Sequence, residues 1–308
     1  MSKEVEDLKL LTPCMVDYLL SYYERLVRIG LIKRLGDRSF GIILPLHVYS
    51  LAANVLFEMR KRLPREVRVL DIGCGLGYGT NLVYELISSS FRHEIIGIDI
   101  DPDYISAAKE FFPDIDFRVL DASRMSLDDF GGRRFDLIIM SEVIEHIEPD
   151  IAIKILNNSR SLLSDSGLLI VSTPVREVYD LFVYTPGHIN EMSIDEFLSS
   201  LQGLEFKLIG LYGIGFVDMR AVRLLRRLGL AARDGDKIKE FKSSFRYLRG
   251  MVFGVFFPKK YRCGLYTNHL QSVRCLIKFG CPKKLNYGEG AMIQVGVLRR
   301  VESQEDIS

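Results

Sequence analysis

The sequence predicts an α/β fold in which helices cover both faces of a mostly parallel sheet, and three observations lead to it. Apolar stretches of strand length alternate with stretches of helical spacing along residues 65–213. The strand-like stretches are apolar almost throughout, as parallel strands buried on both faces are. The first of them runs straight into a glycine-rich turn, Gly73-Cys-Gly-Leu-Gly77, and a helical pattern follows at once.

Residues 1–64 are expected to form an N-terminal helical cap. Met15 to Leu35 carries apolar residues at helical spacing and is followed by Gly36, and a second helical pattern runs from Leu46 to Leu63. Basic residues 60–62 would then occupy the last turn of the second helix, where positive charge suits the helix dipole. These helices either pack against the next stretch or form a lid over a ligand site in it.

Residues 65–213 are expected to form the core domain. Strands are predicted at Val67–Ile72, Glu94–Asp99, Asp116–Asp121, Phe135–Met140, Gly167–Ser172 and Phe206–Tyr212. Helices are predicted at Tyr78–Ile87, Tyr104–Phe112, Ile151–Leu163 and Ser193–Leu201, the last with Ser193 and Glu196 in a capping box. After residues 214–290 comes a last core strand within 291–300, at Ala291–Leu298, and residues 301–308 are expected to be a frayed tail.

The composition excludes several classes of protein. Of the 308 residues 48% are hydrophobic and 26% are charged, which excludes wholesale disorder. No unbroken apolar run reaches the roughly 18 residues of a membrane span, and the acidic residues near the start are wrong for a signal peptide. Five cysteines without a C-x-x-C pair argue against a disulfide framework and a four-cysteine zinc site. We therefore expect a cytoplasmic protein.

The glycine turn points to a nucleoside ligand without phosphates. Its pattern is G-x-G-x-G, and the dinucleotide fingerprint G-x-G-x-x-G would require glycine where Tyr78 stands. Asp71, just before the turn, would repel a diphosphate and would pair with an ammonium group. Asp99 closes the second strand, where a carboxylate can bind both ribose hydroxyls. Asp121 closes the third strand and could accept a hydrogen bond from an adenine amino group, with Ala122 beside it.

Each of these aspartates alone is more simply explained as a helix cap or a turn residue. Three of them at the ends of successive strands, beside one glycine turn, are hard to explain as caps. The ligand that they imply has a cationic amino acid end, a ribose and an adenine.

On these motifs the sequence resembles the class I S-adenosylmethionine-dependent methyltransferases. The matching segments are Val69–Gly79, Ile98–Asp101, Leu120–Ser123, Phe135–His146 and Leu162–Pro174. The resemblance implies a Rossmann-like sheet of seven strands, whose last strand is antiparallel and inserted beside the sixth. It also implies S-adenosylmethionine as the cofactor. The cofactor-binding residues predicted with it are Asp71, Gly73, Cys74, Gly75, Gly77, Tyr78, Asp99, Ile100, Asp121, Ala122, Ser141 and Glu142.

The segment after the fourth strand, Ser141-Glu-Val-Ile-Glu-His146, lies where a methyl acceptor should bind. Glu142, Glu145 and His146 are expected on one helical turn, with Glu142 and His146 facing the same way. The predicted catalytic residues are Glu145, His146 and also His188, which follows the fifth strand.

Three interpretations of this set compete. In the first, Glu142 contacts the cofactor, while Glu145 and His146 only shape the loop. In the second, His146 is a general base that takes a proton from an acceptor hydroxyl.

In the third interpretation, Glu142, Glu145, His146 and His188 bind a divalent metal ion. Small-RNA 2′-O-methyltransferases have a similar Glu, Glu, His, His set, and some ubiquinone-biosynthesis O-methyltransferases have a similar E-x-x-E-H. The chain lacks a second histidine next to His188. We therefore predict no metal ion and regard RNA as a less favoured acceptor.

Residues 214–290 form a basic insertion before the last strand. Its positive character is strong, with 17 lysines and arginines against four acidic residues between positions 218 and 288. Such a charge attracts anionic partners. Residues 219–261 mix apolar and basic residues as a peripheral membrane helix does. The insertion either packs with its charges in solvent, caps the substrate, or contacts a membrane, while nucleic acid is disfavoured for want of a known binding module.

We therefore predict an enzyme that transfers a methyl group from S-adenosylmethionine to a hydroxyl or amine. The acceptor expected is a small, anionic metabolite, glycan or lipid-linked compound. One alternative is a metal-assisted RNA 2′-O-methyltransferase, and another is a cofactor-binding scaffold that contacts membrane or RNA without turnover. A nicotinamide oxidoreductase is disfavoured by Tyr78 and Asp71.

Overall fold

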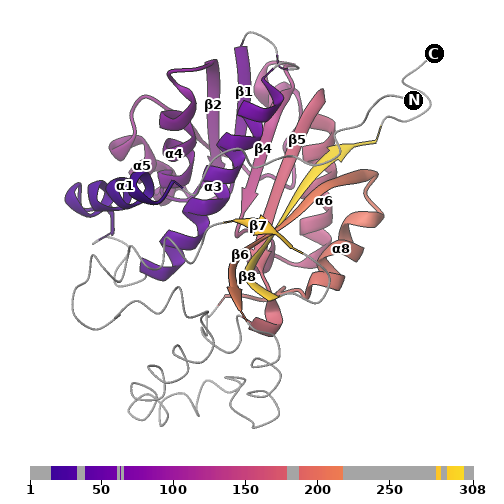
Figure 1. Ribbon diagram of the computed structural model, residues 1–308. Helices are drawn as coiled ribbons and strands as arrows, with labels where there is room; N and C mark the ends of the chain where they lie inside the picture. Colours follow the sequence, from indigo (N-terminus) through magenta and orange to yellow (C-terminus); the bar gives the residue numbers. More distant parts are fainter. Residues whose placement is uncertain are drawn as a thin grey trace, which may run out of the picture.

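Eight strands form one sheet through the centre of the part of the chain that the structure describes (Figure 1). The structure, a computed structural model, describes residues 15–32, 39–60, 63, 66–178, 187–217, 282–285 and 290–301. The strands are β1 (Glu66–Ile72), β2 (Arg92–Asp99), β3 (Asp116–Val119), β4 (Phe135–Ser141), β5 (Leu163–Pro174), β6 (Phe206–Val217), β7 (Lys283–Lys284) and β8 (Gly290–Arg300). Their order in the sheet is β3-β2-β1-β4-β5-β8-β6-β7. The predicted α/β fold is confirmed.

The pairing of the strands confirms the direction predicted for the last one. Strands β1 to β5 pair in parallel, so that Val69 of β1 lies between Ile95 of β2 and Leu137 of β4. Strand β8 runs antiparallel between β5 and β6. The sheet has eight strands rather than seven because β7 pairs with Tyr212 and Gly213 of β6. Two residues are too short a stretch to show any hydrophobic period in the sequence.

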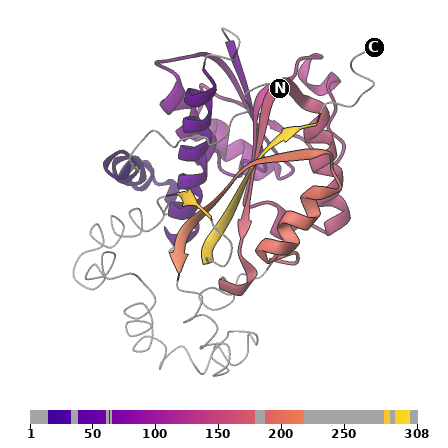
Figure 2. The same ribbon diagram turned by 45° about the vertical axis from the view of Figure 1, so that its right-hand side comes forward.

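Helices cover both faces of this sheet (Figures 1 and 2). They are α1 (Val16–Arg28), α3 (Ser39–Met59), α4 (Tyr78–Ile87), α5 (Pro102–Phe111), α6 (Pro149–Leu162) and α8 (Ile194–Gln202), with two 3-10 turns, η1 (Asp128–Phe130) and η2 (Ile144–His146). Side chains alternate across each strand, so Leu137 and Ile139 of β4 pack in the core with α1, α3, α4 and α5. Ile138 and Met140 pack on the opposite face with α6 and α8.

The two N-terminal helices differ from the predicted ranges. Helix α1 ends at Arg28 rather than at Leu35, because Gly30 takes a left-handed conformation with φ +83° just after it. Helix α3 begins at Ser39, before Pro45, and ends at Met59. Its predicted start at Leu46 was wrong because proline costs one hydrogen bond without always ending a helix. Arg60 therefore follows the helix instead of lying in its last turn, and the other two basic residues, 61 and 62, lie outside the described residues.

Helix α3 is the most apolar helix among the described residues, and it lies inside the fold. Residues Ile42–Met59 are long and apolar enough to cross a membrane by composition alone, but 83% of that window is buried within the protein. A core helix of a globular protein has the same properties. The capping box predicted for α8 is confirmed, since the Ser193 Oγ accepts the Glu196 N–H at 3.1 Å. Residues 219–261, predicted to be a basic amphipathic segment, lie outside the described residues.

Candidate functional site

The glycine turn joins the carboxyl end of β1 to α4, and three of its glycines have left-handed backbones. Their φ angles are 69° at Gly73, 52° at Gly75 and 76° at Gly77. A Cβ at Gly77 would lie 2.6 Å from the Phe117 ring, and one at Gly73 would lie 2.5 Å from Val143. At Gly75 a Cβ would meet nothing within 4 Å. The turn therefore packs against β3 and the end of β4, and at Gly75 its backbone faces open space in which a ligand can approach.

Asp71 lies directly beneath this turn and is fully buried. Its carboxylate accepts hydrogen bonds from the Thr80 hydroxyl at 2.5 Å and from the Tyr49 hydroxyl at 3.3 Å. Burial raises the pKa of Asp71 to about 7, although the two hydroxyls lower it and Asp99 raises it a little. The contact that we predict between Asp71 and an ammonium group stays a prediction.

Asp99 connects the end of β2 to the glycine turn. Its Oδ2 accepts the Gly75 N–H at 2.9 Å, and its Oδ1 accepts the Asp101 N–H at 3.0 Å. A carboxylate offers about four lone-pair positions, so two remain for ribose hydroxyls. Ile100 beside it is 69% exposed, as a residue that covers a ligand could be.

Asp121 follows the shortest parallel strand, which ends at Val119 rather than at Asp121 itself. Its Oδ1 accepts the Ser123 N–H at 2.9 Å. Hydrogen bonding from the Ser123 side chain, together with this backbone N–H, holds the pKa of Asp121 below its usual range. The Ala122 carbonyl oxygen accepts a hydrogen bond from the Asn158 side-chain amide at 3.0 Å. Because β1, β2 and β3 are neighbours and run parallel, the structure brings the three predicted aspartates to one edge of the sheet.

Ser141 is the last residue of β4, Glu142 follows it, and both contact β5. The two hydroxyls of Ser141 and Ser172 lie 3.2 Å apart, and the Ser172 hydroxyl donates to Glu142 Oε1 at 2.8 Å. Burial raises the pKa of Glu142 to about 7. Glu142 has a left-handed backbone, with φ 56°, and lies outside the turn η2. The prediction that Glu142, Glu145 and His146 share one helical turn was therefore wrong.

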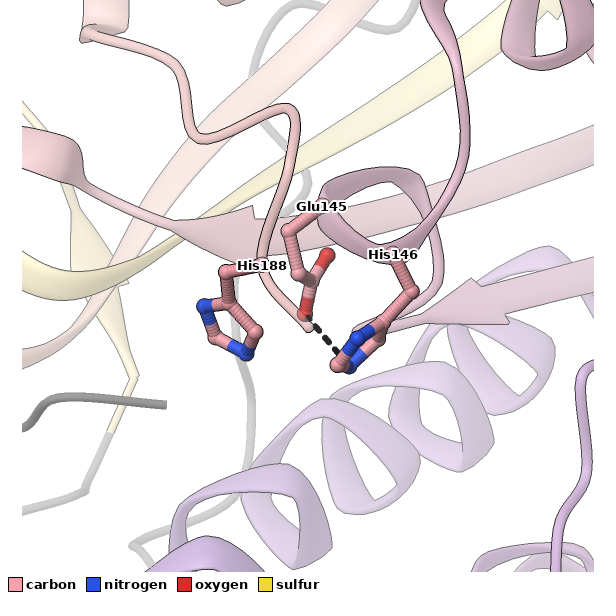
Figure 3. A group of neighbouring side chains, drawn as sticks. All are labelled: Glu145, His146 and His188. Carbon is pink, nitrogen blue, oxygen red and sulfur yellow. Dashed lines mark ion pairs between the residues drawn. The ribbon is translucent and has the colours of Figure 1, made fainter. Parts of the chain in front are cut away.

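Glu145, His146 and His188 form a cluster without Glu142 (Figure 3). One ligand atom from each lies within 4.8 Å of the other two. The imidazole rings of His146 and His188 meet edge to face, with centroids 4.6 Å apart. Backbone hydrogen bonds join the two segments, because Ile189 and Asn190 donate to the Glu145 carbonyl at 2.8 and 3.1 Å.

The three side chains differ in burial. Glu145 is 1% exposed, and its Oε2 accepts the Thr173 hydroxyl at 3.0 Å. Burial raises the pKa of Glu145 well above its usual range. His146 has 46% of its side chain exposed, and partial burial lowers its pKa, as does His188 nearby. The His188 side chain is only 6% exposed, and its Nδ1 lies 2.7 Å from Glu191 Oε1.

Several residues of the site were missed in the sequence. Tyr49 comes from α3, whose apolar pattern indicated only packing, and Thr80 comes from α4. Ser172 and Thr173 belong to the segment Leu162–Pro174, which resembles the methyltransferase family, but neither was named as a site residue. Glu191 lies three residues after His188 and was also missed. A carboxylate three residues from a histidine was the only signal that could have found Glu191.

The described site fits the cofactor that the sequence predicts. The glycine turn offers backbone to a ligand at Gly75, and Asp99 has free lone pairs beside it. Carboxylates predominate among the ionisable side chains at the ends of β1 and β2 and just after β3 and β4, where Arg124 pairs with Asp121. They favour a cationic ligand over a diphosphate. Asp71, Asp99, Asp121 and Glu142 would hold such a ligand.

Comparisons with known proteins agree with this geometry. Residues 46–211 match the family model of a methyltransferase domain. A probable S-adenosylmethionine-dependent methyltransferase of Mycobacterium tuberculosis is 28% identical over 176 residues, which cover 55% of this chain and 57% of that protein. A ubiquinone biosynthesis O-methyltransferase of Cereibacter sphaeroides is 34% identical over 129 residues, which cover 40% of this chain and 48% of that protein. The matches thus span only about half the length of these curated relatives.

Among solved structures, the plantazolicin methyltransferase BpumL in complex with an analog and SAH has a TM-score of 0.50 at 14% identity. The likeness covers 93% of this chain and 98% of that one. It shows that the two chains share a fold.

Proposed function

The chain belongs to the class I S-adenosylmethionine-dependent methyltransferases, and we propose that it methylates a hydroxyl oxygen of a small, anionic acceptor. When bound, the cofactor supplies an electrophilic methyl group on a sulfonium. The chain binds and orients it with the backbone of Gly73–Gly77 and with Asp99. Methyl transfer is an in-line displacement, so holding the two reactants in line supplies most of the acceleration.

The observation that carries the proposal is the cluster of Glu145, His146 and His188 beside the glycine turn. Gly73 packs against Val143, two residues before Glu145, so the cluster lies close to where the methyl group would be presented. A hydroxyl must lose its proton before or during attack, and a cluster of carboxylate and imidazole groups can assist this loss. An amine with a free lone pair needs no such help, which is why we favour oxygen.

Two further observations support the acceptor class. The Cereibacter sphaeroides relative is named an O-methyltransferase of ubiquinone biosynthesis. The strongly basic residues 218–288 would attract an anionic compound, whether a metabolite, a glycan or a lipid-linked precursor. A cytoplasmic location and a membrane contact through 219–261 remain predictions.

Transfer of labelled methyl groups from S-adenosylmethionine to metabolite, glycan, lipid and RNA extracts tests the proposal. We expect a methyl ether in an anionic small product, formation of S-adenosylhomocysteine, and loss of both in Asp99→Ala and His146→Ala. His93→Asn, a histidine at the far end of β2, should retain activity. A product methylated only on nitrogen or carbon would overturn the oxygen assignment, and methylated RNA would favour the alternative acceptor.

A further inference from the structure

We propose that Glu145, His146 and His188 bind one divalent transition-metal ion through one carboxylate oxygen and two imidazole nitrogens (Figure 3). The proposed ligand set differs from the four residues suggested by the sequence, because Glu142 turns away to Ser172 on β5. Three observations carry the proposal. One carboxylate oxygen of Glu145 has no hydrogen-bond partner among the described residues, and the Nδ1 of each histidine is held by an acceptor oxygen.

The carboxylate of Glu145 lacks a partner on one side. Its Oε2 accepts the Thr173 hydroxyl, while its Oε1 is buried and has no hydrogen-bond donor among the described residues. His146 Nε2 is 4.0 Å from this oxygen, too far for a hydrogen bond. An unsatisfied buried carboxylate oxygen is costly, and a cation between it and the two imidazoles would remove that cost.

Both histidines are oriented as metal ligands are. The Nδ1 of His146 lies 3.2 Å from the Gly187 carbonyl oxygen, and the Nδ1 of His188 lies 2.7 Å from Glu191 Oε1. These oxygens are acceptors, so each Nδ1 carries the proton and donates it. Each Nε2 then keeps its lone pair and can coordinate an ion. A carboxylate or a backbone carbonyl on the far nitrogen is the usual support of a ligating histidine.

The spacing of the cluster fits one small ion after a slight closure. Donor atoms about 2.1 Å from a tetrahedral ion lie about 3.4 Å from one another. The three ligand atoms are already within 4.8 Å, so side-chain rotations can close the site. His146 is partly exposed and leaves a path for the ion from solvent. Two nitrogens and one oxygen favour zinc, manganese, iron or cobalt over magnesium and calcium, which prefer oxygen ligands.

Three protein ligands leave at least one coordination position open, as in catalytic rather than structural metal sites. Resting on the proposed function, we assign that position to the acceptor's hydroxyl, whose pKa a divalent ion would lower. The hydroxyl proton then passes to solvent, the O–CH3 bond forms as the S–CH3 bond breaks, and no oxidant or reductant is needed. Binding of the ion itself does not depend on this role.

Calorimetric titration of the full, chelator-treated chain with Zn²⁺, Mn²⁺ and Mg²⁺ tests the site in the absence of cofactor and acceptor. We expect one ion per chain for Zn²⁺ or Mn²⁺, much weaker binding of Mg²⁺, and a rise of the unfolding temperature with added metal. Glu145→Gln should abolish both effects, while Glu191→Gln, which changes the partner of His188 Nδ1, should weaken binding about 10- to 100-fold. His93→Asn, the matched histidine control, should bind as the parent does.

Absence of binding tighter than about 1 mM would overturn the proposal. Binding that survives in Glu145→Gln would overturn it as well, because the ion would then lie elsewhere. Circular dichroism of each variant checks that it folds. If S-adenosylhomocysteine forms in chelator while no ion binds, the metal site fails and the proposed methylation stands. If an ion binds as expected but no acceptor hydroxyl is methylated, the metal site stands and the proposed methylation fails.

Discussion

Replacing Asp71 by asparagine should stabilise the protein at neutral and alkaline pH. Burial raises the pKa of Asp71 from 3.8 to about 7, so the folded state holds this carboxyl's proton more tightly than the unfolded state does. Stability is therefore lost as the pH rises from about 4 to about 7, and the loss is complete above that range. A shift of about three pKa units corresponds to about 4 kcal/mol, which is the upper limit of the gain.

Asparagine is the appropriate probe because it can keep both contacts of Asp71. Its carbonyl oxygen can accept the Tyr49 hydroxyl, and its amide can donate to a Thr80 hydroxyl that has rotated. Urea unfolding of Asp71→Asn and of the parent is measured across this pH range. Asp114→Asn, a change at an exposed carboxylate, is the matched control.

The expected result is a stability difference that is close to zero near pH 4 and grows toward pH 8. A difference independent of pH, or a variant less stable than its parent at pH 8, would refute the reasoning. The same variant should bind S-adenosylmethionine more weakly, because it lacks the charge predicted to meet the ammonium group. Calorimetry near pH 7 in buffers of different ionisation enthalpy should show less proton release on binding for the variant than for the parent, because Glu142, whose pKa is also raised to about 7, remains.

Three further changes test the site and its supports. Asp99→Ala removes a carboxylate that accepts a backbone N–H and is predicted to bind the ribose, a loss of about 1.5–3 kcal/mol. S-adenosylhomocysteine should then bind about 10- to 100-fold more weakly in calorimetry, and unchanged affinity would contradict the assignment. Gly79→Ala places a Cβ 2.1 Å from the Tyr49 ring and should destabilise the chain by about 1–3 kcal/mol in urea unfolding. Adding Tyr49→Leu should restore part of that loss, and if it restores none, the strain does not come from the ring. Ser193→Ala removes the N-cap of α8 and should cost about 1 kcal/mol, whereas Ser200→Ala in the same helix should cost almost nothing.

The strands were predictable from the sequence because each is a short apolar run bounded by turn residues. The antiparallel direction of β8 and its place beside β6 followed only from the resemblance to a family. The order of the other strands was not predicted, since pairing depends on contacts far apart in the chain. The end of α1 and the start of α3 were mispredicted because in each case a single residue was misjudged. Gly30 ends one helix by a left-handed turn, and Pro45 does not end the other.

The candidate site was predictable as a set of residues but not as a set of contacts. Glu145, His146 and His188 were named together, and the structure brings them together. The left-handed backbone of Glu142 removes that residue from the turn, and no side-chain pattern indicates such a conformation for glutamate. Tyr49 was missed because a tyrosine in an apolar helix looks like any packing residue.

The order of the strands explains why the two halves of the site meet where they do. From β1 the chain moves outward to β2 and β3, and it then crosses back to place β4 on the other side of β1. Open α/β sheets bind ligands where the strand order reverses in this way. The aspartates of β1 to β3 lie on one side of that point, and the cluster of Glu145, His146 and His188 lies on the other. Gly73 touches Val143 across the boundary, so the glycine turn proposed to orient the methyl donor is packed against the segment proposed to orient its acceptor.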